Sequence, residues 1–371
     1  MRAVAAFPER REVALVEHPR PTIATPTGVL VRTLEVGVCG TDAELCAFHF
    51  GYAPPGEEYL VLGHEALGMV EEAGPEVVGL SPGDLVVPSV RRPCPRADCP
   101  ACRSGNRDFC VTGEYVERGI FGAHGFLVER FTEEASYLYR VPASLREVAV
   151  LTEPLTIAEK GLRQILAIQR RLPWLRAADD AALLEGKRAV VLGAGPVGIL
   201  GAMLLRSRRC AVWVYSREER SSMRGALVES LGARYRSSTD LSVQELAEEV
   251  GGIELVYEAA GAADLTLAVV EVLGPNGVFI LTGATGGGGR LDLGADALLN
   301  RMVERNLVLA GTVNSSDADF LAAIQDLEAF QGGWPGALER VITGRGPMED
   351  FRSRALTRRG IKEIIDVAAS H

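Results

Sequence analysis

The sequence contains no run of eighteen or more uninterrupted apolar residues, so it predicts no membrane-spanning helix. It also lacks an excess of basic residues. Its 39 basic and 49 acidic side chains give a formal net charge of −10, which argues against nucleic acid or an anionic membrane as a general partner. The opening residues, MRAVAAFPERREVALVEHPRP, lack the basic, apolar and small-residue order of a secretory signal. We therefore expect a cytoplasmic protein, in which clustered thiols favour metal binding over disulfides.

The length of 371 residues, with 47% hydrophobic content, suits two domains. Short apolar runs separated by Gly and Pro predict strands in the first part of the chain, at 28–39, 63–74 and 83–90. Apolar spacing predicts a helix over 157–172, and further on one over 318–330. Between them, strand-like runs alternate with helical stretches, at 188–206, 211–216, 254–261 and 277–283. This alternation predicts the α/β class, with a parallel sheet inserted into a β-rich domain.

Three glycines in the pattern G-x-G-x-x-G directly follow a predicted strand and open a helix: Gly193, Gly195 and Gly198, with Pro196 and Val197 between the last two. The first glycine permits a tight turn, the second lets the backbone approach a pyrophosphate, and the third lets the helix pack against the strand. The helix N-terminus offers free N–H groups to phosphate. This context favours a dinucleotide site over a fortuitous glycine turn.

The end of the next strand indicates which dinucleotide binds. An acidic residue there would accept hydrogen bonds from the adenosine ribose and repel a 2′-phosphate. This chain has Ser216 and Arg217 instead, a hydroxyl and a guanidinium that suit a phosphate. Glu218 and Glu219 follow at once and favour the opposite choice, and Arg217 could equally be a solvated surface charge. The sequence favours NADP and leaves NAD possible.

Four of the seven cysteines lie in one segment: Cys94, Cys99, Cys102 and Cys110. Four thiolates complete the tetrahedral shell of zinc and leave no open position, so such a site stabilises a fold and performs no chemistry. The alternatives are four free cysteines or a zinc ribbon that binds nucleic acid through the nearby arginines. The acidic net charge disfavours the ribbon.

A catalytic metal needs three protein ligands and one exchangeable position. Outside the cysteine segment, the candidates are Cys39 in VCGTDAE, His64 and Glu65 in GHE, and Glu153 in LTEPL. His64 is the most ligand-like of only five histidines. A histidine beside a glutamate is also common in a purely structural role, and spacing alone does not decide between the two.

Several motifs occur together in the order found in the zinc-dependent medium-chain dehydrogenases: VCGTDAE, GHEALGMVEEAG, GDLVVPSV, the four cysteines and GAGPVG. The chain resembles this family over essentially its whole length. Within it, VPSVRRPC, CRSGNRDFCVTGEYVERGIFGAHGF and LTEPLTIAEKGL resemble the archaeal-type glucose 1-dehydrogenases. The resemblance implies a GroES-like β-barrel catalytic domain over 1–154, completed by 315–371, and an inserted Rossmann domain over 155–314. One departure is the first cysteine pair, which the family usually separates by two residues and this chain by PRAD.

The resemblance also implies roles for individual residues. Cys39, His64 and Glu65 would bind the catalytic zinc, and Glu153 stands in the place of the third ligand. Thr41 matches the hydroxyl that receives the substrate proton. Residues expected to face the sugar are Ser89, Glu114, Glu153 and Asn314. Asn314 is also expected to meet the nicotinamide ribose, and Lys362 to contact the cofactor.

The resemblance therefore predicts a zinc-dependent oxidoreductase that converts D-glucose to gluconolactone and transfers a hydride to NADP or NAD. One alternative is a polyol or threonine-type alcohol dehydrogenase, and another is a non-catalytic NAD(P)H-sensing protein. Relatives associate through the edge of the Rossmann sheet and through the segment that carries Cys94, Cys99, Cys102 and Cys110, here called the cysteine lobe. A homodimer or homotetramer is therefore expected.

Overall fold

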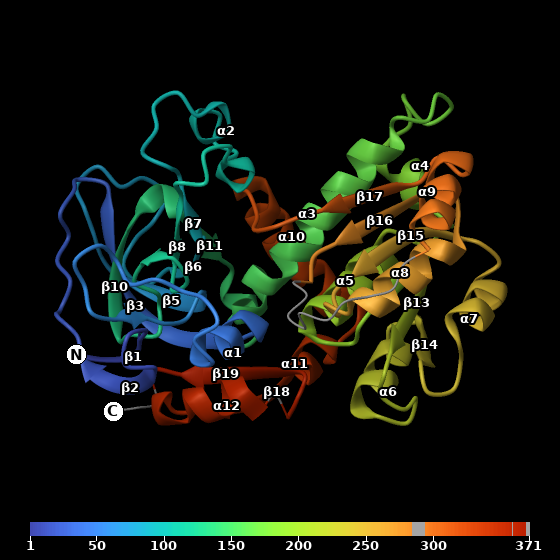
Figure 1. The fold of residues 1–371 in the computed structure, drawn as a ribbon. Helices are drawn as coiled ribbons and strands as arrows, with labels where there is room; N and C mark the ends of the chain where they lie inside the picture. Colours follow the sequence, from blue (N-terminus) through green and yellow to red (C-terminus); the bar gives the residue numbers. More distant parts are fainter. Residues whose placement is uncertain (284–293, 358, 369–371) are drawn as a thin grey trace. The chain divides into compact units, whose positions relative to one another are not determined.

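The structure is a computed structural model that describes residues 1–283, 294–357 and 359–368 (Figure 1). It divides into two compact units. Unit 1 comprises Met1–Thr156, Asn314–Gln331 and Leu338–His371, and unit 2 comprises Ile157–Val313 and Gly332–Ala337. The first boundary therefore falls after 156 where 154 was expected, and the chain returns to unit 1 at 314 where 315 was expected. The short return of 332–337 to unit 2 had no signal in the sequence.

Unit 1 is a β-rich body around one apolar core. Its strands are β1 (Arg2–Phe7), β2 (Glu12–Glu17), β3 (Gly28–Val38), β4 (Leu60–Val61), β5 (Glu65–Ala73), β6 (Leu85–Pro88), β7 (Arg91–Arg92), β8 (Val116–Arg118), β9 (Gly122–Ala123), β10 (Arg130–Glu134), β11 (Leu138–Val141), β18 (Ile342–Gly346) and β19 (Lys362–Asp366). Its helices are α1 (Gly40–Cys46), α2 (Pro100–Arg103), the start of α3 (Thr152–Gln169), most of α10 (Asp317–Gly333) and of α11 (Ala337–Val341), and α12 (Phe351–Thr357). The main sheet has the order β11-β6-β5-β3-β19-β18, with β10 also paired to β3.

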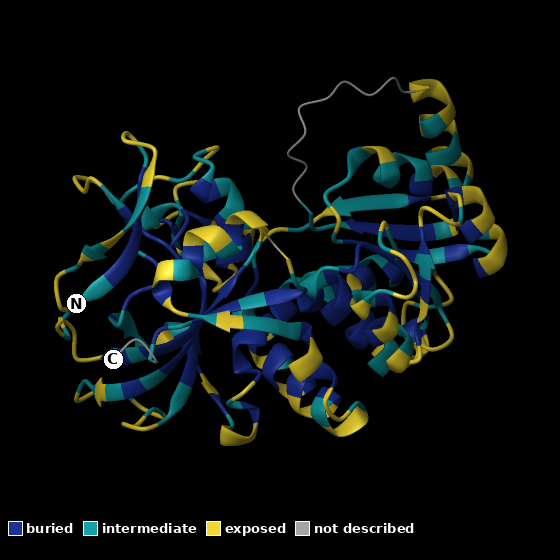
Figure 2. Ribbon diagram, turned by 90° about the horizontal axis from the view of Figure 1, so that it is seen from below, coloured by how far each residue is buried: buried dark blue, intermediate teal, exposed yellow. Residues whose placement is uncertain are grey.

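Strand β3 lies at the centre of this sheet and is almost entirely buried. Its valines at 29, 31, 36 and 38 suit a pleated strand with covered faces. Each buried valine stabilises the fold by about 1.5–3 kcal/mol relative to exposure. Figure 2 shows the same pattern in colour, with buried residues concentrated along the strands.

Strand register brings three chain segments to one end of β3. Gly37 pairs with Glu65 at the start of β5, and Val38 pairs with Glu363 near the start of β19. Because both neighbours are antiparallel to β3, their first residues lie beside its last. Gly37 is needed here, since a Cβ at this position would come within 2.1 Å of the Glu65 carboxylate.

Unit 2 contains a parallel six-stranded sheet, which confirms the doubly wound arrangement expected from the alternating pattern. The strands are β12 (Arg188–Leu192), β13 (Ala211–Ser216), β14 (Arg234–Ser237), β15 (Ile253–Glu258), β16 (Leu273–Leu281) and β17 (Val308–Gly311). Their order is β14-β13-β12-β15-β16-β17, so the chain reverses direction across the sheet between β12 and β15. Ligands of such sheets bind at the carboxyl ends of the strands at that reversal.

The helices of unit 2 include α4 (Asp180–Leu184), α5 (Pro196–Ser207), α6 (Met223–Ser230), α7 (Val243–Val250), α8 (Ala263–Val272) and α9 (Ala295–Glu304). The helix expected over 157–172 is α3, which starts earlier, at Thr152, and ends at Gln169. The apolar periodicity did not reveal this start because Leu155 is the only large aliphatic side chain between Thr152 and Thr156. Proline is tolerated in the first turn, where its missing N–H has no helical partner. Of the helices described, none is both long and apolar enough to cross a membrane.

Candidate active site

Cys39, His64 and Glu65 come together in unit 1, with one ligand atom from each lying within 4.8 Å of the others. Cys39 directly follows β3 and is the N-cap of α1. Its sulfur accepts a hydrogen bond from Thr41 N at 3.2 Å, and its own N–H donates to Asp42 Oδ2 at 2.9 Å. This capping box fixes the direction of the thiol.

His64 faces Cys39 from the residue just before β5. Its Nε2 lies 3.0 Å from Cys39 Sγ, and its Nδ1 lies 3.6 Å from Asp42 Oδ1. Burial would lower the pKa of His64, but the nearby charges of Cys39 and Asp42 outweigh it and raise this pKa well above its ordinary value. The surroundings of the ring therefore favour a positive charge.

The donor set fits zinc. Thiolate sulfur, imidazole nitrogen and carboxylate oxygen are the ligands that zinc takes in proteins. Asp42 Oδ1 and His64 Nδ1 are buried without a hydrogen-bond partner among the described residues. With a cation held by Cys39 and His64, the ring N–H at Nδ1 would face the Asp42 carboxylate, whose negative charge would balance part of the charge of the cation.

Glu65 forms an ion pair with Lys362, the first residue of β19. Lys362 is fully buried, its ammonium forms an ion pair with Glu65, and it donates to Val38 O at 3.0 Å. Burial lowers the pKa of Lys362, but Glu65 and then Cys39 raise it, with a net upward shift. Lys362 was expected to contact the cofactor, and that role stays a prediction; here its charge is engaged within unit 1.

Glu153 lies on the first turn of α3 and is half-buried. Burial, followed by the negative charge of Glu65, raises its pKa to about 8. The charge of Glu65 therefore acts on Glu153. Among the described residues, however, Glu153 does not belong to the set of Cys39, His64 and Glu65 whose ligand atoms lie within 4.8 Å of one another. Its role as a ligand or sugar contact stays a prediction.

Thr41, expected to receive the substrate proton, lies in the first turn of α1 directly after Cys39. Its side chain is half-buried, and its hydroxyl makes no hydrogen bond within the described part of the chain. The hydroxyl is therefore able to bond with a substrate at the Cys39–His64 site.

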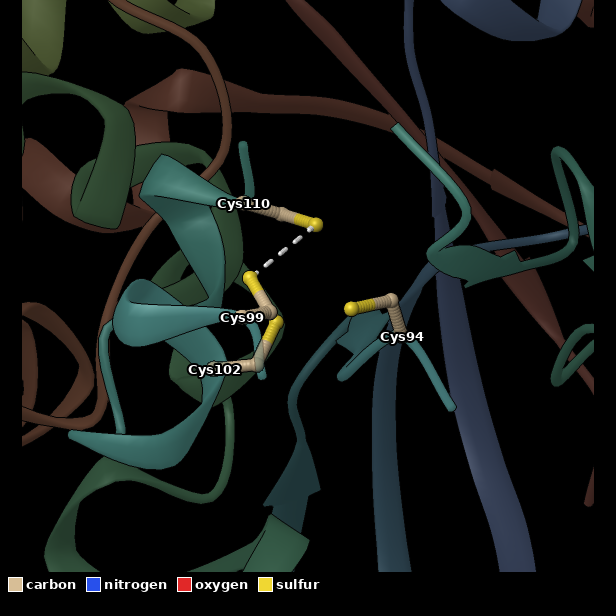
Figure 3. Close-up of side chains that lie close together, drawn as sticks. All are labelled: Cys94, Cys99, Cys102 and Cys110. Atoms are coloured by element: carbon tan, nitrogen blue, oxygen red, sulfur yellow. Dashed lines mark hydrogen bonds between the residues drawn. The ribbon is translucent and has the colours of Figure 1, made fainter. Parts of the chain in front are cut away.

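The four cysteines expected to form a closed site also converge (Figure 3). Their sulfur atoms all lie within 4.8 Å of one another, and Cys99 and Cys110 are 4.0 Å apart. Tetrahedral zinc with bonds of about 2.3 Å places sulfurs roughly 3.8 Å apart. Burial raises the pKa of Cys110, but hydrogen bonds from Thr112 and Gly113 outweigh it and lower this pKa to about 6. The longer spacing between Cys94 and Cys99 therefore does not prevent a zinc-like arrangement.

The residues expected to face the sugar lie in different environments. Ser89 is fully buried, and its hydroxyl accepts a hydrogen bond from Arg92 at 3.2 Å. Glu114 is half exposed, at 50%, and lies 3.8 Å from exposed Arg96. Asn314 donates from Nδ2 to Glu117 Oε1 at 2.9 Å. The structure thus brings Asn314 together with Glu117, a carboxylate that the sequence analysis did not select, and not with Glu114.

The glycine turn of unit 2 has the geometry expected of a phosphate site. Gly193 has φ +96°, and a Cβ on Gly198 would lie 2.1 Å from Gly193 O. Gly195 is the N-cap of α5, with Pro196 and Val197 in the first turn and open space where a Cβ would be. The backbone N–H groups here can therefore approach a pyrophosphate.

Arg217 directly follows β13 and is exposed, with no ion pair among the described contacts. The acidic neighbours that made the sequence ambiguous have partners of their own. Glu218 lies 2.7 Å from Arg224, and Glu219 accepts a hydrogen bond from Ser221. Arg217 itself forms no ion pair with them among the described contacts, so its guanidinium is able to bind a phosphate at this position.

Comparison with known proteins matches both parts of the chain. Residues 25–143 match the alcohol dehydrogenase GroES-like domain, and residues 146–367 match the glucose dehydrogenase C-terminus. The chain belongs to the glucose dehydrogenase family. This confirms the resemblance to the zinc-dependent medium-chain dehydrogenases and the expected combination of a GroES-like domain with a Rossmann sheet.

Individual relatives match this family member over its full length. It is 37% identical to the glucose 1-dehydrogenase of Methanocella arvoryzae, with 100% of both chains covered. It is 38% identical to that of Thermoproteus tenax, with 99% of both covered. Among solved structures, the Haloferax mediterranei glucose dehydrogenase in complex with NADP, Zn and gluconolactone is 34% identical, with a TM-score of 0.87 and 99% of both chains covered.

Besides Asp42, which lies between Cys39 and His64, two other buried carboxylates near the predicted sites were not identified from the sequence. Glu117 lies on β8 and is only 6% exposed. Glu258 ends β15 and accepts hydrogen bonds from Ala260 N, Gly261 N and Gly283 N, which fixes the turn next to Gly193. Glu117 could have been preferred over Glu114 because it stands in the apolar-flanked run YVERGI, whereas Glu114 follows a Thr-Gly turn.

Cys102→Ser should remove the zinc of the cysteine lobe and lower the unfolding temperature by roughly 5 °C or more, because metal binding contributes directly to folding. Elemental analysis should fall from two zinc ions per chain to one. Cys210→Ala, which removes a buried thiol outside both sets, should keep two. Retention of two ions by Cys102→Ser would contradict the assignment.

Arg217→Ala should raise the KM for NADP roughly tenfold and that for NAD less than about twofold, because only NADP carries the 2′-phosphate. Initial rates with each dinucleotide measure this. Arg220→Ala is the matched control, since Arg220 belongs to the same turn but is held by Glu229 at 2.7 Å. Equal effects on both dinucleotides would remove Arg217 from the phosphate site.

Proposed function

We propose that this protein oxidises the C1 hydroxyl of an aldose, D-glucose in the first place, and transfers the hydride to NADP. The observation that carries the proposal is the convergence of Cys39, His64 and Glu65 in a chain that belongs to the glucose dehydrogenase family. A glucose dehydrogenase of similar fold is solved with NADP, Zn and gluconolactone, which supports the same reactants here.

The reaction removes two electrons and one proton from C1 as hydride and a second proton from the C1 oxygen. When bound, zinc supplies a Lewis acid that lowers the pKa of that hydroxyl, and the dinucleotide supplies the hydride acceptor. The residues that would hold the zinc are Cys39 and His64, with Glu65 or Glu153 as the oxygen ligand. Asp42 orients both first ligands, by bonding Cys39 N and lying beside His64 Nδ1.

The proton of the C1 hydroxyl needs an acceptor close to the metal ligands. The Thr41 hydroxyl is suited to this because it follows Cys39 on the first turn of α1 and is not engaged by another described side chain. Threonine relays a proton without holding it, so the proton passes on to solvent. Lys362 fixes the Glu65 carboxylate beside Cys39 and His64 by its ion pair.

Sugar selectivity requires buried polar groups, because a hydroxyl that finds no partner in a closed site costs about 1–3 kcal/mol. Glu117 and Asn314 form such a pair, and the 117–119 segment packs against the residue before His64. A Cβ on Gly119 would lie 2.4 Å from Gly63 O. We therefore propose Glu117 with Asn314 as hydroxyl contacts, alongside the predicted Ser89 and Glu114.

NADP is the proposed cofactor, with NAD as a weaker one. The pyrophosphate would bind at Gly195, Pro196 and Val197, and the 2′-phosphate at Ser216 and Arg217. The pyrophosphate assignment rests on the N-terminus of α5, where no side chain caps the backbone N–H groups. The 2′-phosphate assignment rests on the exposed Arg217, which forms no ion pair among the described contacts.

We also propose that the protein forms a homodimer or homotetramer in the cytoplasm. Strand β17 ends the parallel sheet without a further neighbour among the described strands, and the cysteine lobe exposes Phe109 and Val111 at 46% and 67%. Both features suit self-association. None of the seven cysteines forms a disulfide in the structure, which suits a reducing compartment.

A substrate panel tests the proposed activity directly. Zinc-loaded protein should reduce NADP with glucose at least about tenfold more efficiently, by kcat/KM, than with sorbitol or threonine. Galactose and xylose are included to rank aldoses. A preference for sorbitol or threonine would instead identify a polyol or amino-acid alcohol dehydrogenase, and no turnover with two zinc ions bound would favour the NAD(P)H-sensing alternative.

Glu153→Ala should lower kcat/KM for glucose roughly 100-fold and weaken zinc at the Cys39 site, while the cysteine lobe keeps its ion. Zinc content after mild chelation and circular dichroism separate metal loss from unfolding. Glu147→Ala, an exposed carboxylate earlier in the same region, is the control. Undiminished activity in Glu153→Ala would refute its placement at the metal.

Glu117→Gln should raise the KM for glucose about tenfold, because an amide replaces a charged acceptor of sugar hydroxyls. Glu114→Gln is the matched variant, and its exposure predicts a change of less than about twofold. The reverse ranking would return the sugar contact to Glu114.

A further inference from the structure

Arg91 is a buried arginine that links three parts of unit 1. It lies on β7, is 2% exposed, and stands directly opposite Glu117 in the antiparallel pair β7–β8. It donates from Nε and Nη2 to Glu117 Oε1, at 3.0 and 2.9 Å, and from Nη1 to Asp108 O at 3.3 Å. Its guanidinium also lies over the ring of Tyr115, 3.6 Å from the centroid. These contacts leave it little freedom.

The Arg91–Glu117 pair is one-sided. A guanidinium edge that meets a carboxylate usually bonds both of its oxygens. Here both N–H groups of Arg91 and the amide of Asn314 all bond Oε1. No contact among the described residues uses Oε2. Arg91 therefore fixes the carboxylate and leaves its second oxygen available to accept a hydrogen bond from a ligand.

Asn314 depends on the same oxygen. Its backbone has φ +57°, in the left-handed region that asparagine tolerates better than most residues. Its Nδ2 bonds Glu117 at 2.9 Å and its Oδ1 accepts from Ser315 N at 2.8 Å. A displacement of Glu117 would remove the partner that orients the Asn314 amide. The chain of contacts runs from Arg91 through Glu117 to Asn314.

The cysteine lobe is attached to both ends of this chain. Asp108, whose carbonyl binds Arg91, lies in the short helix Arg107–Phe109 that immediately precedes Cys110. Arg107 beside it is 5% exposed, donates to the Tyr139 hydroxyl at 3.2 Å, and forms an ion pair with Asp317 at the start of α10. Asp317 follows Asn314 by three residues, so the lobe contacts the segment that carries Asn314.

We propose that Arg91 is a positioning residue for sugar recognition, which holds Glu117 and through it Asn314, and that its bond to Asp108 makes this geometry depend on the metal-bound cysteine lobe. The lobe then contributes to substrate affinity as well as to stability. The inference rests on the proposed function, since it takes glucose as the ligand of Glu117 and Asn314.

A double-mutant cycle tests whether Arg91 acts through Glu117. The variants are Arg91→Met, Glu117→Gln and the double variant. Arg91→Met should raise the KM for glucose about tenfold, with kcat within about threefold and the KM for NADP unchanged. The double variant should match Glu117→Gln alone, because residues that act in series are not additive. Additive effects, or equal losses in kcat and in the KM for NADP, would overturn the proposal.

Binding without turnover gives a second readout. D-glucose is titrated calorimetrically into zinc-loaded protein with NADPH, where oxidation cannot proceed. The dissociation constant should rise about tenfold in Arg91→Met, with two zinc ions per chain retained. Arg130→Met is the matched control, since Arg130 makes a two-bond pair with Glu71 elsewhere in unit 1 and should leave glucose binding unchanged.

Two further variants keep the test decisive. If Arg91→Met does not fold, Arg91→Lys is used instead, because it keeps the positive charge but loses the paired N–H donors of the guanidinium. Arg91→Lys should raise the KM for glucose by a factor between one and about ten. Cys102→Ser should raise this KM too, and Arg91→Met added to it should give no further increase. A normal glucose KM in a folded Cys102→Ser would refute the role of the lobe.

The outcomes also separate this proposal from the proposed function. If the unaltered protein neither oxidises nor binds glucose, the proposed function fails. If it does both and the cycle is additive, the proposed function stands and only the role of Arg91 is refuted.

Discussion

The register of β3 with its two neighbours is the constraint on which the site depends. Gly37 opposite Glu65 and Val38 opposite Glu363 place the end of one strand beside the beginnings of two others. Cys39, the pair His64–Glu65, and Lys362 lie far apart in the sequence, and this strand pairing brings them together. A slip of one residue would turn their side chains to the other face of the sheet. The apolar burial of β3 therefore sets the position of the reactive groups.

Charge balance is the second feature that organises the site. Cys39, Asp42, Glu65 and Glu153 bring several potential anions into this region, and Lys362 is a buried cation that compensates part of their charge. Buried anions are tolerated only when cations or hydrogen bonds compensate them. A bound metal fits this arrangement because it adds positive charge at the thiolate and imidazole. The ion pair of Lys362 with Glu65 shows how the protein itself supplies part of that charge.

Much of the architecture could be predicted from local patterns. Alternating apolar runs identified the parallel sheet, and the glycine turn identified the start of α5, because both depend on neighbours within a few residues. The first turn of α3 was missed because its residues carry little apolar periodicity, and Pro154 is compatible with a helix only near its start. The environment of the two nearby carboxylates was the larger difference. Glu114 is exposed, whereas Glu117 faces the buried Arg91 across a strand pair.

The sequence by itself determined the type of protein: a four-cysteine lobe, a dinucleotide turn with Arg217 at the next strand, and thiol, imidazole and carboxylate candidates for a metal. Those features are written in spacing over short distances, which covalent geometry preserves. Tertiary structure decided which carboxylate stands beside Asn314, which groups surround His64, and which partner Glu218 takes. These depend on strand register and on ion pairs that form only in the folded chain, so residue spacing alone does not determine them.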